Sequence, residues 1–173
     1  MKLTLAITGA SGIHLAKKFI EYLPKEIELH LIATDHAKIV ESLEERKITI
    51  HNNKNIGASI ASGSFGVDAM AVIPCSMNTL AKISCGIADN LVTRSASVIL
   101  KEQKKLLLAP REMPFSAIPL ENMLKLSRLN VIISPPVMGY YSESETLEEM
   151  ERFIIGKWYD SLGIENDLYE RWS

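Results

Sequence analysis

The apolar residues of this chain form short continuous runs, and each run precedes a segment with helical spacing. Such runs, which lack the alternation of a half-exposed strand, are typical of strands buried on both faces of a parallel sheet. They predict strands at Leu3–Thr8, Ile27–Ala33, Ala69–Ile73, Leu106–Ala109 and Val131–Ser134. The helical patterns predict helices at Ser11–Leu23, Asp35–Glu45, Ser76–Ser84, Val92–Gln103, Leu120–Leu129 and Thr146–Leu162. We therefore expect an α/β fold: a Rossmann-like, doubly wound parallel sheet with helices on both faces.

Size, charge and cysteine usage exclude several classes of protein. The 173 residues suit a single domain over residues 1–173, and the net charge of −2 does not predict a nucleic-acid surface. No apolar run approaches the ~18 residues that would predict a membrane span. The run after Lys2 leads into a helical pattern, so we read it as a strand and not as a signal peptide. Because Cys75, Cys85 and the four histidines lack ligand spacing, we expect reduced thiols, no metal site and a cytoplasmic protein.

Candidate ligand-binding residues follow the predicted strands, since ligands of a doubly wound sheet bind beyond the carboxyl ends of its strands. The turn Gly9-Ala10-Ser11-Gly12 opens a helix, where N–H groups and the helix dipole attract phosphate. The same residues could instead form a tight turn with Ser11 as N-cap. Ser76, Met77, Asn78 and Thr79 open a second helix, and two such helix starts favour a shared ligand. The irregular segment Arg46–Gly66 predicts a long functional loop.

Charged and aromatic residues follow the last two strands. Arg111 and Glu112 lie between prolines, where arginine could hold a phosphate and glutamate could exchange a proton. A surface ion pair between them is the alternative. Tyr141 ends a proline-rich turn, and packing is the commoner fate of a tyrosine. Lys157 lies beside the apolar stripe of the last helix, where a solvated lysine is the default.

Together these segments resemble the UbiX-type flavin prenyltransferases. The matching motifs are Pro74-Cys75-Ser76-Met77-Asn78-Thr79-Leu80-Ala81-Lys82-Ile83, Gly86-Ile87-Ala88-Asp89-Asn90-Leu91, Thr93-Arg94, Leu100-Lys101-Glu102, Pro110-Arg111-Glu112, Leu120-Glu121-Asn122-Met123-Leu124 and Leu162-Gly163-Ile164-Glu165. The resemblance covers nearly the whole chain. It implies a homododecameric flavoprotein with active sites at subunit interfaces. Such enzymes transfer a dimethylallyl group from dimethylallyl phosphate to N5 and C6 of reduced FMN, without a metal, and supply prenylated FMN to a UbiD-type decarboxylase.

The resemblance also implies roles for individual residues. It assigns FMN binding to Gly9, Ala10, Ser11, Thr34, Ser76, Met77, Asn78, Thr79 and Arg111. It assigns the prenyl phosphate to Tyr141 and Lys157, and catalysis to Glu112, Lys101, Arg94 and Ser11. A further acidic residue of the family corresponds to Glu44 or Glu45, and Ala61–Phe65 is similar to a serine-containing substrate loop. The chain departs from many members at Leu15, where they carry tyrosine, and at Lys157, where they carry arginine.

Two other functions fit parts of the sequence. The first is a flavin-dependent cysteine decarboxylase of the same superfamily, which typically has a Pro-Ala-Ser-Ala-Asn-Thr run and an active-site histidine. Here the run begins Pro74-Cys75, and His14 is the only histidine near a glycine turn. The second is a non-catalytic flavin-binding or chaperone-like subunit, for which flavin binding alone would not require the set Arg94, Lys101, Glu112 and Tyr141.

Overall fold

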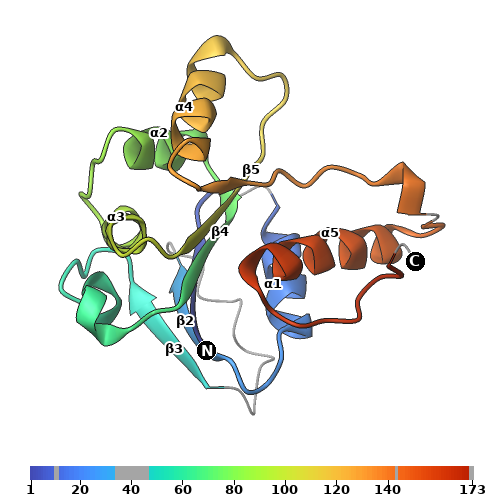
Figure 1. Cartoon of the computed structure of the whole chain (residues 1–173), viewed down its shortest axis with the longest axis horizontal. Helices are drawn as coiled ribbons and strands as arrows, with labels where there is room; N and C mark the ends of the chain where they lie inside the picture. The colour runs from blue at the N-terminus through green and yellow to red at the C-terminus, as the bar shows by residue number, and fades with distance from the viewer. Residues whose placement is uncertain (10–11, 34–46, 143, 172–173) are drawn as a thin grey trace.

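The computed structural model describes residues 1–9, 12–33, 47–142 and 144–171. Six parallel strands form one sheet in the order β3-β2-β1-β4-β5-β6 (Figure 1). The strands are β1 (Lys2–Ile7), β2 (Glu28–Ala33), β3 (Ile48–Asn52), β4 (Ala69–Cys75), β5 (Lys105–Pro110) and β6 (Ile132–Ile133). The helices are α1 (Ile13–Tyr22), α2 (Met77–Ser84), α3 (Leu91–Lys101), α4 (Ala117–Ser127) and α5 (Leu147–Leu162). This strand order is that of a doubly wound Rossmann sheet, which confirms the predicted fold class.

The helices lie on both faces of the sheet, with α1 and α5 on one face and α2, α3 and α4 on the other (Figure 1). Residues of β1 alternate between the two resulting cores: Leu3 and Leu5 pack toward α1 and α5, and Ala6 packs toward the opposite side. All seven residues of β4 are buried. This two-sided burial explains the continuous apolar runs of the sequence. Among the described helices, none combines the length and the apolar character needed to cross a membrane.

The structure corrects the prediction of a long loop at Arg46–Gly66. This segment contains β3 and two short 3-10 turns, η2 (Ser59–Ala61) and η3 (Gly63–Phe65). The strand β3 pairs with β2 alone, and three of its five residues are exposed. An edge strand of this kind carries no continuous apolar run, so the pattern that identified the other strands could not detect it.

Element boundaries also differ from those expected. The helix α4 begins at Ala117 and not at Leu120, and β6 is limited to Ile132–Ile133. Thr146 is the N-cap of α5 and forms a capping box with Glu149, which fixes the start of that helix. The predicted helix Asp35–Glu45 lies outside the described residues.

Candidate functional site

The carboxyl ends of β1 and β4 are tied together by three hydrogen bonds. The N–H and the hydroxyl of Thr8 both donate to the carbonyl oxygen of Pro74, each over 3.1 Å. The N–H of Ser76 donates in return to Thr8 Oγ1, over 3.0 Å. The strand order reverses between β1 and β4, and open α/β sheets bind ligands at this switch point. The two predicted helix starts therefore lie side by side at the expected position.

The first helix start is a glycine turn covered by an arginine. Gly9 and Gly12 have φ values of 97° and 96°, a left-handed conformation that glycine adopts at little cost. A Cβ atom on Gly12 would lie 3.5 Å from Pro74 Cβ and 3.7 Å from Arg111 Cδ, so the Arg111 side chain extends over this turn. The N-cap of α1 is Gly12 and not Ser11, and no described side chain caps it. The first N–H groups of α1 are therefore suited to an anion.

Several predicted residues of this turn and of the segment after β2 are not described. Ala10, Ser11, Thr34, Glu44 and Glu45 all lie outside the described residues. Their assigned roles stay predictions.

At the second helix start, the Ser76 side chain caps the helix and the side-chain amide of Asn78 is exposed. The Ser76 hydroxyl accepts a hydrogen bond from the Thr79 N–H over 3.2 Å and donates to Thr79 Oγ1 over 3.0 Å. Thr79 is buried, and Met77 packs against the core on the α2 side of the sheet. Asn78 is exposed. Of the four predicted residues, Ser76 and Thr79 thus build the helix start, and Asn78 is the side chain most open to a ligand.

Arg111 and Glu112 follow β5 at the same edge of the sheet, and both side chains are exposed. Within the described part of the chain neither takes part in an ion pair or a side-chain hydrogen bond, so the alternative of a surface ion pair is wrong. Both charges are unpaired among the described residues and are therefore available to a ligand, and the Arg111 side chain lies beside the start of α1.

The described cysteine and histidine side chains do not form a competing metal or nucleophile site. Burial raises the pKa of the Cys75 thiol to about 12, so this thiol stays protonated and does not act as a nucleophile. His14 Nε2 lies 3.1 Å from Glu151 Oε2, so this histidine of α1 is paired with the neighbouring helix α5. His30 Nδ1 and His51 Nε2 are 3.1 Å apart at the β2–β3 edge. In the described ranges no three His, Cys, Asp or Glu side chains are grouped to hold a metal ion.

A hollow of about 400 Å³ brings two predicted cations to the serine-containing turn. It is lined by Ala61, Ser62, Gly63, Arg94, Ser97, Val98 and Lys101. Lys101 Nζ lies 3.0 Å from Glu102 Oε1 in an exposed ion pair, which is weak in water. Arg94 has no such partner among the described residues. We call this feature the α3 hollow; its cations and hydroxyls are those of an anion site.

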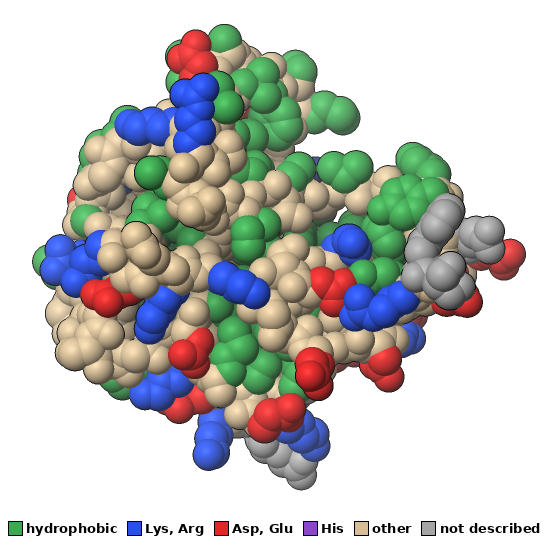
Figure 2. All heavy atoms as spheres, viewed as in Figure 1, with side chains coloured by type: hydrophobic (Ala, Val, Ile, Leu, Met, Phe, Trp, Pro, Cys, Tyr) green, Lys and Arg blue, Asp and Glu red, His purple; other side chains and the backbone are tan. Residues whose placement is uncertain are grey.

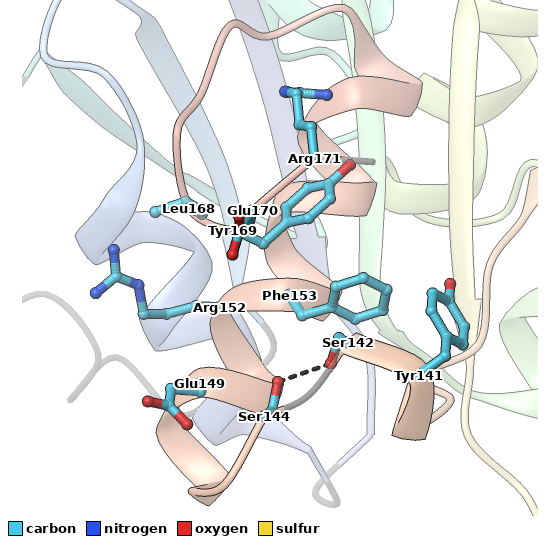
Figure 3. Close-up of a pocket in the computed structure, with 10 residues that line it drawn as sticks. All are labelled: Tyr141, Ser142, Ser144, Glu149, Arg152, Phe153, Leu168, Tyr169, Glu170 and Arg171. Carbon is cyan, nitrogen blue, oxygen red and sulfur yellow. Dashed lines mark hydrogen bonds between the residues drawn. The ribbon is translucent and has the colours of Figure 1, made fainter. Parts of the chain in front are cut away.

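A second hollow, of about 590 Å³, lies between the start of α5, the 3-10 turn η4 (Tyr140–Ser142) and the C-terminal tail (Figure 3). We call it the α5 hollow. The Tyr141 ring packs edge-on against Phe153, with ring centres 5.6 Å apart. Lys157 follows Phe153 by one helical turn, and its Nζ lies 5.8 Å from the centre of the Tyr169 ring. Tyr141 and Lys157 are thus joined through two aromatic rings.

The two hollows share no lining residue, so one chain does not bring Arg94 and Lys101 together with Tyr141. Phe153, Tyr169 and Arg171 of the α5 hollow were not predicted from the sequence. The i, i+4 spacing of Phe153 and Lys157 on one helix could have identified the first. The tail residues carry no periodic signal.

Comparison with known proteins identifies the family. The Flavoprotein family profile matches residues 1–157. Flavin prenyltransferase UbiX of Helicobacter pylori (strain ATCC 700392 / 26695) is 56% identical over 185 aligned positions, which cover 99% of this chain and 98% of that protein. The chain belongs to the UbiX-type flavin prenyltransferases. The resemblance found in the sequence motifs is therefore confirmed.

Two solved UbiX-like structures share this fold over their full length. The dodecameric FMN-dependent UbiX-like decarboxylase from Escherichia coli O157:H7 is 41% identical, with a TM-score of 0.90 and complete coverage of both chains. AnUbiX in complex with FMN and dimethylallyl pyrophosphate is 35% identical, with a TM-score of 0.90 over 99% of this chain and 97% of that one. The fold that carries the switch point and the two hollows is thus shared with these UbiX-like structures.

Proposed function

We propose that this protein is a flavin prenyltransferase that moves a dimethylallyl group from dimethylallyl phosphate to N5 and C6 of reduced FMN. The observation that carries the proposal is the switch point, where Thr8, Pro74 and Ser76 join two helix starts beneath the Arg111 side chain. Relatives named flavin prenyltransferase and a neighbour bound to FMN and a dimethylallyl donor support it.

FMN suits the switch point for geometric reasons. Gly9 and Gly12 have no side chains to keep a ligand from the backbone, and the start of α1, which no described side chain caps, favours a phosphate. Arg111 adds a guanidinium that can grip the phosphate or the ring edge, and Asn78 adds an exposed amide. At the start of α2, Ser76, Met77 and Thr79 form the other side of the proposed FMN site. When bound, reduced FMN supplies the nucleophilic nitrogen and carbon of the transfer.

The donor loses a phosphate, and negative charge grows on its oxygens as the carbon–oxygen bond breaks. We assign Arg94, Lys101, Lys157 and the Tyr141 hydroxyl to this charge, because preorganised cations and donors stabilise it most where water is excluded. Glu112, exposed beside Arg111, passes a proton to the phosphate or takes one from the flavin. Ser11 is a predicted further catalytic residue.

Oligomerisation would bring the two hollows together. Large apolar side chains are exposed before and along α4 and on the segment that leads to α5, with Met113 91% and Tyr140 84% exposed. Figure 2 shows apolar side chains on two lobes with a notch between them. Exposed apolar surface of this extent marks an association site. We infer a homododecamer in which the α5 hollow of one chain meets the α3 hollow of another, in line with the dodecameric neighbour.

The proposed product defines the biological setting. A flavin with an added ring is useful only to an enzyme that binds it as cofactor, so we propose a UbiD-type decarboxylase as its recipient. Both proteins would meet in the cytoplasm, and residues 1–173 would form one flavin-binding domain.

Two other functions remain as weaker candidates. A cysteine decarboxylase would need a free histidine near the flavin, whereas His14 faces Glu151. A non-catalytic flavin-binding subunit would not need the cations of the α3 hollow. Relatives matched over their whole length carry the prenyltransferase name, which favours the first proposal over both.

Mass spectrometry of the flavin tests the proposal. The protein is incubated without oxygen with reduced FMN and dimethylallyl phosphate, and the flavin is then released. We expect a flavin heavier by one prenyl unit. Unchanged FMN that copurifies with the protein would contradict the proposal and favour the binding subunit, and FAD or NAD bound in preference to FMN would contradict the cofactor assignment.

A further inference from the structure

The C-terminal tail folds back along α5. Gly163 ends the helix with a φ of 79°, and the Ile164 N–H donates to the Tyr159 carbonyl oxygen over 2.9 Å, which reverses the chain. Residues 164–171 then return toward the beginning of α5, close to η4 (Figure 1). Residues of the tail and of η4 therefore line the same α5 hollow.

Asp160 holds this tail through three side chains. Its carboxylate accepts hydrogen bonds from the Tyr169 hydroxyl and from Asn166 Nδ2, the latter over 2.9 Å. The Arg171 guanidinium donates twice to it, over 2.8 and 3.1 Å. Two-pronged arginine–carboxylate contacts are among the stronger and more directional ion pairs.

The carboxylate of Asp160 stays ionised in this position. Partial burial acts to raise its pKa, but the hydrogen bonds from Arg171, Tyr169 and Asn166 outweigh burial, and the pKa lies below the usual range for aspartate. Burial and the contact with Asp160 raise the pKa of the Tyr169 hydroxyl, so this group remains a donor. We call the contacts of Asp160 with Tyr169, Asn166 and Arg171 the clamp. Because Asp160 is ionised and Tyr169 is protonated, the clamp is formed throughout the neutral pH range.

A row of three rings connects the clamp to the donor-binding residues. Tyr169 packs edge-on against Phe153 at 5.2 Å, and Phe153 packs edge-on against Tyr141 at 5.6 Å. A Cβ atom on Gly156 would clash with Tyr169, and one on Gly139 would clash with Phe153, so glycine at both positions permits the row. In Figure 3 the three rings follow one another along the hollow.

Two cations lie over the ring at the tail end of the row. Lys157 Nζ is 5.8 Å and Arg171 Cζ is 5.2 Å from the centre of the Tyr169 ring. Such distances are within the range of cation–π attraction. Displacement of Tyr169 would thus remove support from Lys157 directly and from Tyr141 through Phe153.

We propose that Asp160 is a positioning residue for the prenyl donor, which it serves by holding Tyr169 and Arg171 so that Tyr141 and Lys157 face the donor phosphate. The inference rests on the proposed function. Asp160 does not line the α5 hollow, so its proposed effect on the donor passes through the ring row. The competing explanation is a clamp that stabilises the fold and has no effect on the donor.

Steady-state kinetics of Asp160→Asn separate the two explanations. The amide keeps the shape of the carboxyl group but cannot accept both prongs of Arg171. We expect the KM for dimethylallyl phosphate to rise about three- to tenfold, with kcat at saturating donor and the affinity for FMN unchanged. Tyr169→Phe, which keeps the ring and deletes only the hydroxyl, should raise KM in the same direction by a smaller factor.

Asp167→Asn is the matched control, because Asp167 is an exposed carboxylate of the same tail with no polar contact to a described residue. It should behave like the parent protein. If Asp160→Asn lowers the melting temperature but leaves KM at the parent value, the clamp is merely structural and the proposal is wrong. If Asp160→Asn does not fold, an unchanged KM in Tyr169→Phe overturns it.

The parent protein in the same assay separates this inference from the proposed function. A parent without turnover contradicts the function itself. A parent that turns over beside variants with the parent KM contradicts only the role of Asp160. In a Lys157→Met background, Asp160→Asn should raise KM by a smaller factor than in the parent protein, since only its effect through Tyr141 remains.

Discussion

The two ends of the proposed site are built in different ways. At the cofactor end, the groups that meet are the carboxyl ends of buried strands, and Thr8 fastens two of them through hydrogen bonds to Pro74 and from Ser76. At the donor end, Tyr141 and Lys157 are exposed side chains of a 3-10 turn and of α5. Their support comes from the buried Phe153 ring and the half-buried Tyr169 ring, which pack at the margin of the core.

This difference indicates what a single chain can preorganise. Packing of the sheet in the core sets the geometry of the switch point in every folded chain. The cofactor end should therefore be complete in each subunit. Arg94 and Lys101 line the α3 hollow, whereas Tyr141 lines the α5 hollow and Lys157 lies beside it, so the donor site should require a second chain. Changes at the cofactor end should therefore affect FMN, and changes at the donor end should affect the donor or the rate alone.

The largest expected effect comes from Glu112→Gln. The change keeps the shape of the side chain and removes a group that can exchange a proton, so prenylation should slow by about 10²–10⁴-fold with FMN binding retained. Single-turnover flavin spectra measure the rate. Glu121→Gln, at an exposed carboxylate of α4, is the control. A parent-like rate in Glu112→Gln would reduce Glu112 to a structural role.

Removal of the Lys157 charge should affect the donor end only. Lys157→Met preserves length and helix propensity, and the loss of a charged contact with phosphate should raise the KM for dimethylallyl phosphate by roughly 10–100-fold. Lys157→Arg should rescue it, and FMN affinity should be level in both. Lys125→Met, at an exposed lysine of α4, should change nothing. Parent-like use of the donor by Lys157→Met would show that Lys157 is a solvated lysine.

Thr8→Val tests the cofactor end. Valine keeps the branched shape but leaves the Ser76 N–H without its acceptor, which should lower the free energy of unfolding by about 1–3 kcal/mol. FMN affinity should fall, and the KM for the donor should stay at the parent value. Thr49→Val, at an exposed position of β3, is the matched control for urea unfolding and fluorescence titration. A changed donor KM with intact FMN binding would reverse the roles of the two ends.

The smallest effect concerns the β2–β3 edge, which belongs to neither end. Burial, and then the neighbouring His30, lower the pKa of His51, so the folded protein binds a proton less readily than the unfolded chain. The free energy of unfolding is therefore not reduced by His51 above its ordinary pKa of 6.5. It decreases as the pH falls below that value, because the unfolded chain then binds the proton more readily. Urea unfolding from about pH 7.5 to about pH 5.5 should show this loss, and His51→Gln should diminish it. A parent-like slope in that variant would exclude His51 as the cause.

The same contrast explains how much the sequence could predict. Strands such as β1 and β4 are buried on both faces, so their apolar runs revealed the fold and the residues after them revealed the cofactor end. The edge strand β3 was missed because it is largely exposed. The tail was missed because a single carboxylate, Asp160, orders it through contacts that have no periodic pattern. Only the family motifs assign Tyr141 and Lys157 to the donor, and this stays a prediction; periodicity alone would have assigned them to packing and to solvent.

Complementation between two impaired variants tests most directly whether the donor site is shared between chains. Lys101→Met alters the α3 hollow and Lys157→Met alters the residue beside the α5 hollow. The two variants are co-expressed with different affinity tags, and mixed oligomers are isolated by two successive purifications. Each variant alone serves as the reference for residual activity.

If each donor site takes Lys101 from one chain and Lys157 from another, random mixing leaves about a quarter of the sites with both lysines. The mixed oligomers should therefore recover about a quarter of the parent activity at low donor concentration. If both lysines of a site came from the same chain, no site would be restored. Mixed oligomers no more active than the two variants alone would contradict a shared donor site.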